Sequence, residues 1–294
     1  MIPADFTHAS FLCLLALLEK PFKTGDGGEA VPVGWLVFKT GEGRQTFLVG
    51  STPTLFHQLN IMGVAMTAQE ILIDYKNGKI PAYVSEPEFN KSVGVIVVSA
   101  IFGVDDDTKK VCDRLADSGF PAMAVNMFWQ DDTDSGPLSG AEHERAKARS
   151  TRVDRKDGNA YVKAALSKMK SIKSCNGKVV VFGFCYGGPY VVEAAARLGI
   201  DGGVTFHGSF IEKFLPEFEH ITCPIEFHYG DNDAIAPMNT IEQVKVECDK
   251  RENRDLFVYP GGEHGYMFPN RGPGYHAEAA DLSWERAINF LNKL

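Results

Sequence analysis

Apolar and polar positions follow two different periods along this chain, and the change between them separates strands from helices. Helical spacing of apolar residues predicts helices that begin near Asp105 and that cover 157–172, 237–250 and 276–293. Continuous apolar runs, typical of strands buried on both faces of a sheet, occur at 93–99, 121–126, 179–184, 203–206, 225–230 and 256–259. This alternation predicts an α/β fold, with a mostly parallel twisted sheet and helices on both of its faces.

The chain before residue 93 has a different pattern. Two strand-like runs, EILIDY and IPAYVS, flank a KNG turn at 76–78 and predict a hairpin. Further upstream, the apolar run at 9–18 is shorter than the roughly 20 residues of a membrane span and lacks the basic start of a signal peptide, so we expect a short helix there. We therefore divide the chain into an N-terminal extension of unknown role, residues 1–65, and one α/β domain, residues 66–294.

Composition narrows the possible partners. The chain has 294 residues, of which 44% are hydrophobic, and a net charge of −8, which argues against nucleic acid as a partner because phosphates need a basic face. The six cysteines form no CxxC and the eight histidines form no HxxxH or HxH pair, so we expect a reduced, cytoplasmic protein with no metal, no cofactor and no membrane attachment.

The stretch VVVFGFCYGG, at 179–188, is the main candidate for chemistry. Its strand runs directly into Cys185, with Gly183 and Gly187 two places on either side, which is the pattern of a nucleophile elbow with cysteine in place of serine. The start of the following helix favours a thiolate. The alternative is that Cys185 is one more small apolar residue in a strand, turn and helix.

Two later motifs favour the catalytic interpretation. The segment HYGDND, at 228–233, and the segment GGEHGY, at 261–266, each follow a strand-like run. Nucleophile, acid and histidine therefore occur in the chain order of α/β-hydrolases, and the carboxyl ends of parallel strands bring such groups together.

These motifs resemble the dienelactone hydrolase family of α/β-hydrolases from about residue 69 to the end. The family has a cysteine in GxCxGG, an aspartate in a GxxD turn and a histidine followed by a small and an aromatic residue. The resemblance implies a triad of Cys185, Asp233 and His264, and it favours Asp233 over Asp231, which we expect to organise the turn. IFGV at 101–104 resembles the family's oxyanion loop.

The resemblance also suggests how the substrate is held. Backbone amides of Ile101 and Tyr186 are the expected oxyanion hole. Candidates for contact with the substrate follow strand ends or correspond to carboxylate-binding arginines of the family, and they are Trp129, Arg145, His207 and Phe268. For the aromatic residues and the histidine, packing in the core is the alternative interpretation.

Two positions depart from the family. Bacterial dienelactone hydrolases have a glutamate directly before IFG that interacts with the resting cysteine, and this chain has Ala100. They also have an arginine after the histidine that binds the substrate carboxylate, and this chain has Phe268, with Arg271 nearby in sequence. We therefore expect an altered substrate preference.

The sequence predicts a hydrolase that cleaves carboxylic esters or lactones through an acyl-cysteine. Its partner is then a small-molecule ester or lactone, and the expected assembly is a monomer or a homodimer. A noncatalytic ligand-binding protein on a hydrolase scaffold is one alternative. An acyltransferase or a peptidase that uses the same triad is the other.

Overall fold

The computed structural model describes residues 36–40, 43–47, 66–76, 78–88, 91–271 and 274–294. The chain divides into two compact units, Met1–Ile61 and Met62–Leu294. In the first unit, the described residues form an antiparallel pair of strands, β1 (Leu36–Thr40) and β2 (Gly43–Phe47). The helix expected at 9–18 lies outside the described residues.

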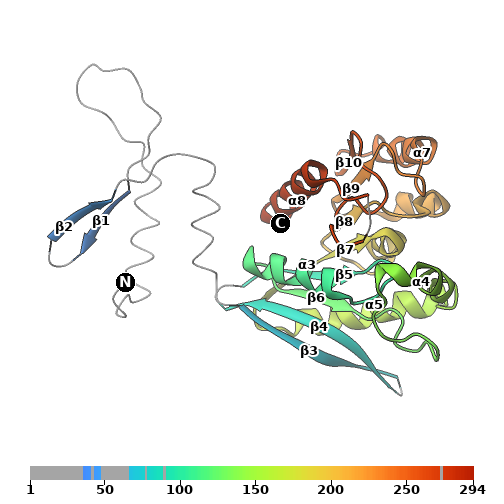
Figure 1. Cartoon of the computed structure of the whole chain (residues 1–294), viewed down its shortest axis with the longest axis horizontal. Helices are drawn as coiled ribbons and strands as arrows, with labels where there is room; N and C mark the ends of the chain where they lie inside the picture. Colours follow the sequence, from blue (N-terminus) through green and yellow to red (C-terminus); the bar gives the residue numbers. More distant parts are fainter. Residues whose placement is uncertain (1–35, 41–42, 48–65, 77, 89–90, 272–273) are drawn as a thin grey trace. The chain divides into compact units, whose positions relative to one another are not determined.

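An eight-stranded sheet forms the centre of the second unit, with the strand order β10-β9-β8-β7-β5-β6-β4-β3 (Figure 1). The pairs β3·β4 and β4·β6 are antiparallel, and the other pairs are parallel. The predicted hairpin and the mostly parallel sheet are thus confirmed. The strands are β3 (Met66–Tyr75), β4 (Gly78–Pro87), β5 (Ser92–Val98), β6 (Ala122–Val125), β7 (Cys175–Phe184), β8 (Gly202–Phe206), β9 (Ile225–Gly230) and β10 (Arg254–Tyr259).

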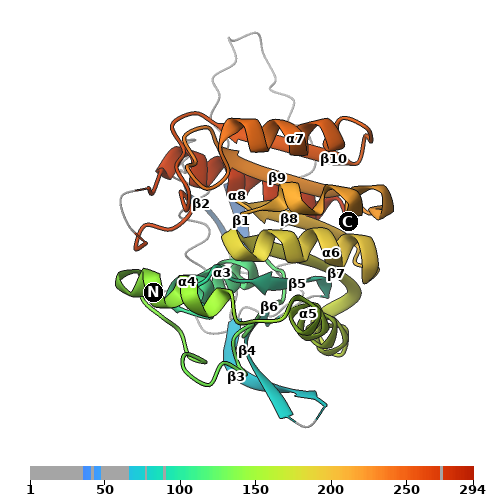
Figure 2. The ribbon, with the colours of Figure 1, turned by 90° about the vertical axis from the view of Figure 1, so that its right-hand side faces the viewer.

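Helices cover both faces of this sheet, as Figures 1 and 2 show. One apolar core packs α3 (Asp106–Asp117) and α8 (Ala277–Asn292) against the sheet. The other core packs α5 (Arg155–Lys170), α6 (Gly188–Arg197) and α7 (Met238–Cys248) against the opposite face. The remaining helical segments lie in connections and are η1 (Gly140–Glu142), α4 (His143–Ser150), η2 (Cys185–Gly187) and η3 (Ile211–His220).

Strand β7 shows why the apolar runs lack alternation. Val179 and Val181 belong to the core under α5, α6 and α7, whereas Val180, Phe182 and Phe184 belong to the core under α3 and α8. Successive side chains of a strand point to opposite faces, so a strand with a core on each side needs apolar residues throughout. β7 lies between β5 and β8, which places its carboxyl end at the middle of the sheet edge.

Candidate active site

Cys185 lies directly after β7, at a sharp turn into η2 and α6. Its φ angle is 51°, a left-handed backbone conformation that costs free energy in a residue other than glycine. The turn also needs close backbone contacts: a Cβ atom on Gly183 would lie 2.5 Å from the Gly187 oxygen, and one on Gly187 would lie 2.2 Å from the Val98 oxygen. Glycine at both positions therefore permits the strand, the turn and β5 to cross at this point.

Asp233 and His264 follow β9 and β10 and bind each other. His264 Nδ1 lies 2.8 Å from one carboxylate oxygen of Asp233 and 3.0 Å from the other. Asp233 is buried, and its Oδ1 also accepts hydrogen bonds from the amides of Ile235 (2.7 Å) and Ala236 (2.9 Å). The carboxylate is thus held in place from its own loop. His264 Nε2 has no hydrogen-bond partner among the described residues.

Cys185 and His264 shift each other's pKa toward an ion pair. Burial raises the pKa of Cys185, but the charge of His264, the Ser209 hydroxyl and the Tyr186 amide lower it, and the pKa is lowered overall. For His264, burial lowers the pKa, while the charge of Cys185 and the hydrogen bond to Asp233 raise it to about 10. The site therefore favours a thiolate beside an imidazolium ion.

Other described cysteines have the opposite shift. Burial raises the pKa of three of them: Cys112, Cys223 and Cys248. The pKa of Cys223 rises to about 11 and that of Cys248 to about 12. Buried thiols of this kind are unreactive because the thiolate is the nucleophile. Cys185 differs from these three through its histidine neighbour.

The two amides expected to form an oxyanion hole lie on segments that meet at Cys185. Ile101 and Cys185 pack against the same small apolar cluster, which contains Ala100, Phe102, Leu138 and Ala146. The Tyr186 amide is close enough to hydrogen-bond the Cys185 sulfur.

Arg149 lies in the mostly polar stretch HERAKARS, yet it is fully buried. Its Nε and Nη2 donate to the carbonyl oxygen of Ile101 at 3.2 and 2.8 Å. Its Nη1 donates to the carbonyl oxygens of Asp134, at 2.6 Å, and of Gly136, and burial lowers its pKa to about 10. The guanidinium group thus joins the loop of Ile101 to the segment after β6.

Ser209 is a second residue near the reacting atoms that sequence patterns did not indicate. Its hydroxyl oxygen lies 3.3 Å from Cys185 Sγ, and its amide donates to the Cys185 carbonyl at 3.0 Å. It belongs to TFHGSF, the segment in which we had selected His207. A single serine has no pattern around it that would have identified this contact.

His207 and Phe268 lie in the buried layer next to His264. The His207 ring is 5.0 Å from that of His264 and 6.0 Å from that of Phe268, measured between centroids. Both His207 nitrogens lack hydrogen-bond partners among the described residues, and burial holds its pKa well below the usual range. Phe268 also packs against Phe184. A neutral imidazole thus packs against the His264 ring, and Phe268 packs against that imidazole.

Trp129 packs in a separate aromatic cluster near the β3–β4 hairpin. Its ring makes edge contacts with Tyr75, at 6.1 Å, and with Tyr161, at 5.8 Å. A Cβ atom on Gly78 would lie 2.7 Å from this ring. These neighbours belong to β3, α5 and β4, whereas the triad lies beyond β7, β9 and β10.

Both candidate arginines are already paired with carboxylates. Arg145, on α4, forms ion pairs with Asp134 and Glu142. Arg271 is nearly buried, donates to both oxygens of Asp105 at 2.7 Å and lies 3.9 Å over the ring of Phe268. A substrate carboxylate would have to compete with these ion pairs.

Two further polar residues near the strand ends form hydrogen bonds that hold the structure together. Asp231 accepts a hydrogen bond from the Gly261 amide at 2.7 Å, so it ties the loop after β9 to the loop after β10. His228 is fully buried, and its ring bonds to the Tyr259 hydroxyl at 2.8 Å.

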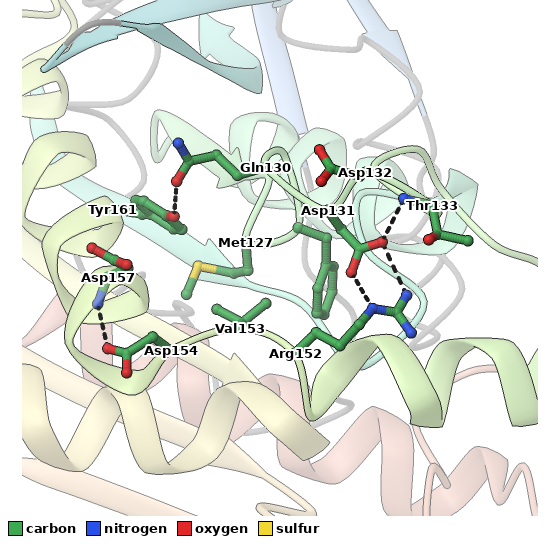
Figure 3. A pocket seen from close by; sticks show the side chains of 11 residues that line it. Met127, Gln130, Asp131, Asp132, Thr133, Arg152, Val153, Asp154, Asp157 and Tyr161 are labelled. Atoms are coloured by element: carbon green, nitrogen blue, oxygen red, sulfur yellow. Dashed lines mark hydrogen bonds and ion pairs between the residues drawn. The ribbon is translucent and has the colours of Figure 1, made fainter.

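A cavity of about 400 Å³ opens beside the segment after β6 (Figure 3). Phe128, one of its lining residues, also packs against Tyr186, at 5.4 Å between ring centroids. None of the three triad residues lines the cavity. The Asp131–Arg152 ion pair forms one wall, and Tyr161 bonds to Gln130 on another.

Among the described residues, no helix combines the length and the apolar character that a membrane crossing requires. The same part of the chain contains no group of three or more histidine, cysteine, aspartate or glutamate side chains arranged to hold a metal ion.

The strand order, the elbow and the three loops at the carboxyl edge define an α/β-hydrolase. The model of the dienelactone hydrolase family matches residues 80–294, and the chain belongs to that family. A carboxymethylenebutenolidase 1 of Cupriavidus pinatubonensis is 24% identical over 221 residues, which cover 74% of this chain and 93% of the relative.

Two further comparisons agree. A carboxymethylenebutenolidase of a Pseudomonas species (strain P51) is 26% identical over 232 residues, covering 78% of this chain and 97% of the relative. A crystal structure of a dienelactone hydrolase-like promiscuous phosphotriesterase from metagenomic libraries superposes with a TM-score of 0.68 and 25% identity. That match covers 78% of this chain and 99% of the other. The predicted fold and family are thus confirmed.

Proposed function

We propose that the protein hydrolyses carboxylic esters or lactones through an acyl-cysteine on Cys185, with His264 and Asp233 as the other members of a triad. The observation that carries the proposal is geometric: Cys185 lies at a left-handed turn directly after β7, and Asp233 holds Nδ1 of His264 at 2.8 Å. The pKa shifts of the two groups, lowered for Cys185 and raised to about 10 for His264, agree with this arrangement. An unreactive buried cysteine has the reverse shift, as Cys248 does.

In the first half of the reaction, the Cys185 thiolate attacks the carbonyl carbon. A bond forms between sulfur and carbon, and the carbonyl electrons move to oxygen, where the amides of Ile101 and Tyr186 stabilise the negative charge. When the intermediate collapses, the bond from carbon to the leaving oxygen breaks. The leaving alkoxide takes the proton of the His264 imidazolium ion.

Acylation itself prepares the second half. The charge of Cys185 is the largest of the influences that raise the pKa of His264, and a thioester carries no such charge. The pKa of His264 therefore falls in the acyl-enzyme, and neutral imidazole becomes available to take a proton from water. Asp233 holds Nδ1 throughout, so that Nε2 faces the reaction.

The substrate preference that we propose is for neutral, apolar groups. The arginines nearest to the family's carboxylate-binding positions, Arg145 and Arg271, are both in ion pairs, and Phe268 is buried. A dienelactone carboxylate would have to break one of these pairs to gain a charge-assisted contact. The cysteines recorded as free in the described residues, Cys112, Cys175, Cys185, Cys223 and Cys248, suit a reducing cytoplasm.

Trapping of the acyl-enzyme tests the proposal. After brief mixing with p-nitrophenyl acetate and an acid quench, mass spectrometry should find the acetyl group on the peptide that contains GFCYGG. Cys185→Ala should lack both the adduct and turnover. An adduct on Cys112 or Cys223, or no turnover of neutral esters and lactones by the wild type, would overturn the assignment and favour a noncatalytic binding protein.

A further inference from the structure

A hydroxyl group outside the triad lies against the sulfur atom of Cys185. Ser209 Oγ is 3.3 Å from Cys185 Sγ, and Ser209 is only 4% exposed. Within the described part of the chain, the sulfur is the one hydrogen-bond partner recorded for this hydroxyl. Because buried hydroxyl groups use their donor in nearly all proteins, the Ser209 proton is expected to point at the sulfur.

The segment after β8 is shaped to hold Ser209 in this position. His207, two residues before Ser209, and Phe210, directly after it, have left-handed φ angles of 41° and 60°, which cost free energy outside glycine and persist where the surroundings require them. A Cβ atom on Gly188 would lie 2.7 Å from the Cα of Gly208. The paired glycines thus let this segment touch the start of α6, and the Ser209 amide is bonded to the elbow.

We propose that Ser209 is a further catalytic residue, whose hydroxyl donates a hydrogen bond to the Cys185 thiolate. The inference rests on the proposed function. In the resting enzyme the bond stabilises the negative sulfur, and it weakens when the sulfur electron pair forms the bond to the acyl carbon. When water has added and the carbon–sulfur bond breaks, the electron pair returns to sulfur and the hydrogen bond forms again. Ser209 keeps its proton in every step.

None of the other groups named around the sulfur is an uncharged side-chain hydrogen-bond donor. His264 supplies the positive charge and Tyr186 supplies a backbone amide. Ala100, buried in the cluster against which Cys185 packs, has only a methyl group. Ser209 is then the uncharged side-chain donor at the thiolate. The titratable side chains around Cys185 and its histidine are Tyr186, His207, Asp233 and His264.

The pH dependence of alkylation by iodoacetamide tests the role. Because a hydrogen bond to a charged group is lost, Ser209→Ala should raise the midpoint for alkylation of Cys185 by about one pH unit. At pH values below both midpoints, alkylation and acylation by p-nitrophenyl acetate should then fall about tenfold. At pH 10 the rates should equal or exceed those of the wild type, because a less stabilised thiolate is more nucleophilic.

Matched variants separate this effect from a loss of structure. Ser209→Thr keeps a hydroxyl and should restore the low-pH rate, whereas Ser209→Gly should behave like Ser209→Ala. Ser283→Ala removes a hydroxyl that is equally buried but bonded to Met267 and Ala280, and it should leave the midpoint unchanged. Equal losses at every pH, or an unchanged midpoint in both Ser209→Ala and Ser209→Gly, would overturn the role of Ser209.

The wild-type profile distinguishes this failure from failure of the proposed function. If wild-type Cys185 has an unshifted midpoint that His264→Ala does not alter, the proposed thiolate–imidazolium pair itself is wrong. If the wild-type midpoint is low and depends on His264, but not on Ser209, only the further inference fails.

Discussion

Two groups of charged side chains follow strands of the same sheet, and they differ in how many of their polar atoms have hydrogen-bond partners. In the segment 131–152, after β6, Asp131 binds Arg152 through two hydrogen bonds of 2.6 and 2.9 Å, and Arg145 binds two carboxylates. After β9 and β10, Asp233 binds one nitrogen of His264, and the other nitrogen has no partner among the described residues.

The difference separates charges that hold the structure from charges that can react. An arginine that already binds carboxylates of the protein gains little binding free energy from a substrate carboxylate, because the new ion pair replaces an existing one. A buried imidazole nitrogen without a partner is costly to keep, and Nε2 of His264 differs from the unpartnered nitrogens of His207 because its ring interacts with the Cys185 thiol and is held by Asp233. An unpartnered nitrogen on a ring held in this way is therefore a better guide to function here than charge alone.

The largest effect is expected when the orientation of His264 is lost. Asp233→Asn can still accept the amides of Ile235 and Ala236 through its carbonyl oxygen, but its amide group presents donors to Nδ1 and favours the wrong tautomer. We expect kcat to fall by about four orders of magnitude and rapid alkylation of Cys185 at pH 6 to disappear. Steady-state ester hydrolysis and an iodoacetamide profile measure both.

Asp231→Asn provides the matched control, since Asp231 lies in the same turn and its side chain, among the described residues, bonds to the Gly261 amide alone. Its kcat should stay within about threefold of the wild type. A comparable loss in both variants would mean that the turn, and not the carboxylate at His264, is required.

A smaller loss is expected from Arg149, which belongs to the structural segment but contacts the catalytic one. Arg149→Met keeps packing against Phe128 and removes the donors to the Ile101 carbonyl. Because an oxyanion donor contributes about 10²–10³ in kcat, misplacing the Ile101 amide should lower ester hydrolysis roughly 10- to 100-fold. Alkylation by iodoacetamide forms no oxyanion and should be unaffected.

Arg254→Met removes a comparable guanidinium group, which donates to the carbonyls of Glu247, Phe218 and Ile221 away from the site. It should destabilise the protein without changing the ratio of hydrolysis to alkylation. If Arg149→Met lowers both reactions in parallel, Arg149 contributes to general stability and does not position the Ile101 amide.

The sequence predicted best what depends on local pattern. Buried strands such as β7 need apolar residues throughout, and the elbow needs glycine at 183 and 187. Both features could therefore be predicted from the sequence. Of the three residues in the predicted order, Asp233 and His264 are in contact at the sheet edge, and their roles in catalysis stay a prediction.

Contacts between distant segments were not predictable in the same way. Ser209 reaches Cys185 across 24 residues of chain through a left-handed loop, and no residue type is reserved for such a contact. Arg149 stands in HERAKARS, a mostly polar stretch in which nothing indicates a buried side chain. Its burial depends on three backbone carbonyls, of Ile101, Asp134 and Gly136, that only the folded loops provide.

The smallest effect on activity is expected at the Asp131–Arg152 pair, where the cost should appear in stability. The hydrogen bond from Arg152 lowers the pKa of Asp131 from 3.8 to about 2. A carboxyl group with a lowered pKa contributes stability above its unfolded value, and the contribution is lost as the pH falls through the folded value. Arg152→Met should therefore lower Tm at pH 7, and the difference from wild type should shrink below about pH 4.

Because the Arg152 side chain is 42% exposed, we expect a decrease in Tm of only about 1–3 °C, with kcat within about twofold of the wild type. Thermal melts between pH 3 and 7 measure the difference, and Lys245→Met, which breaks a pair with both side chains more than half exposed, shows what a solvated ion pair contributes. A tenfold loss of kcat in Arg152→Met would contradict the division into structural and reactive charges, because it would make this ion pair part of the chemistry.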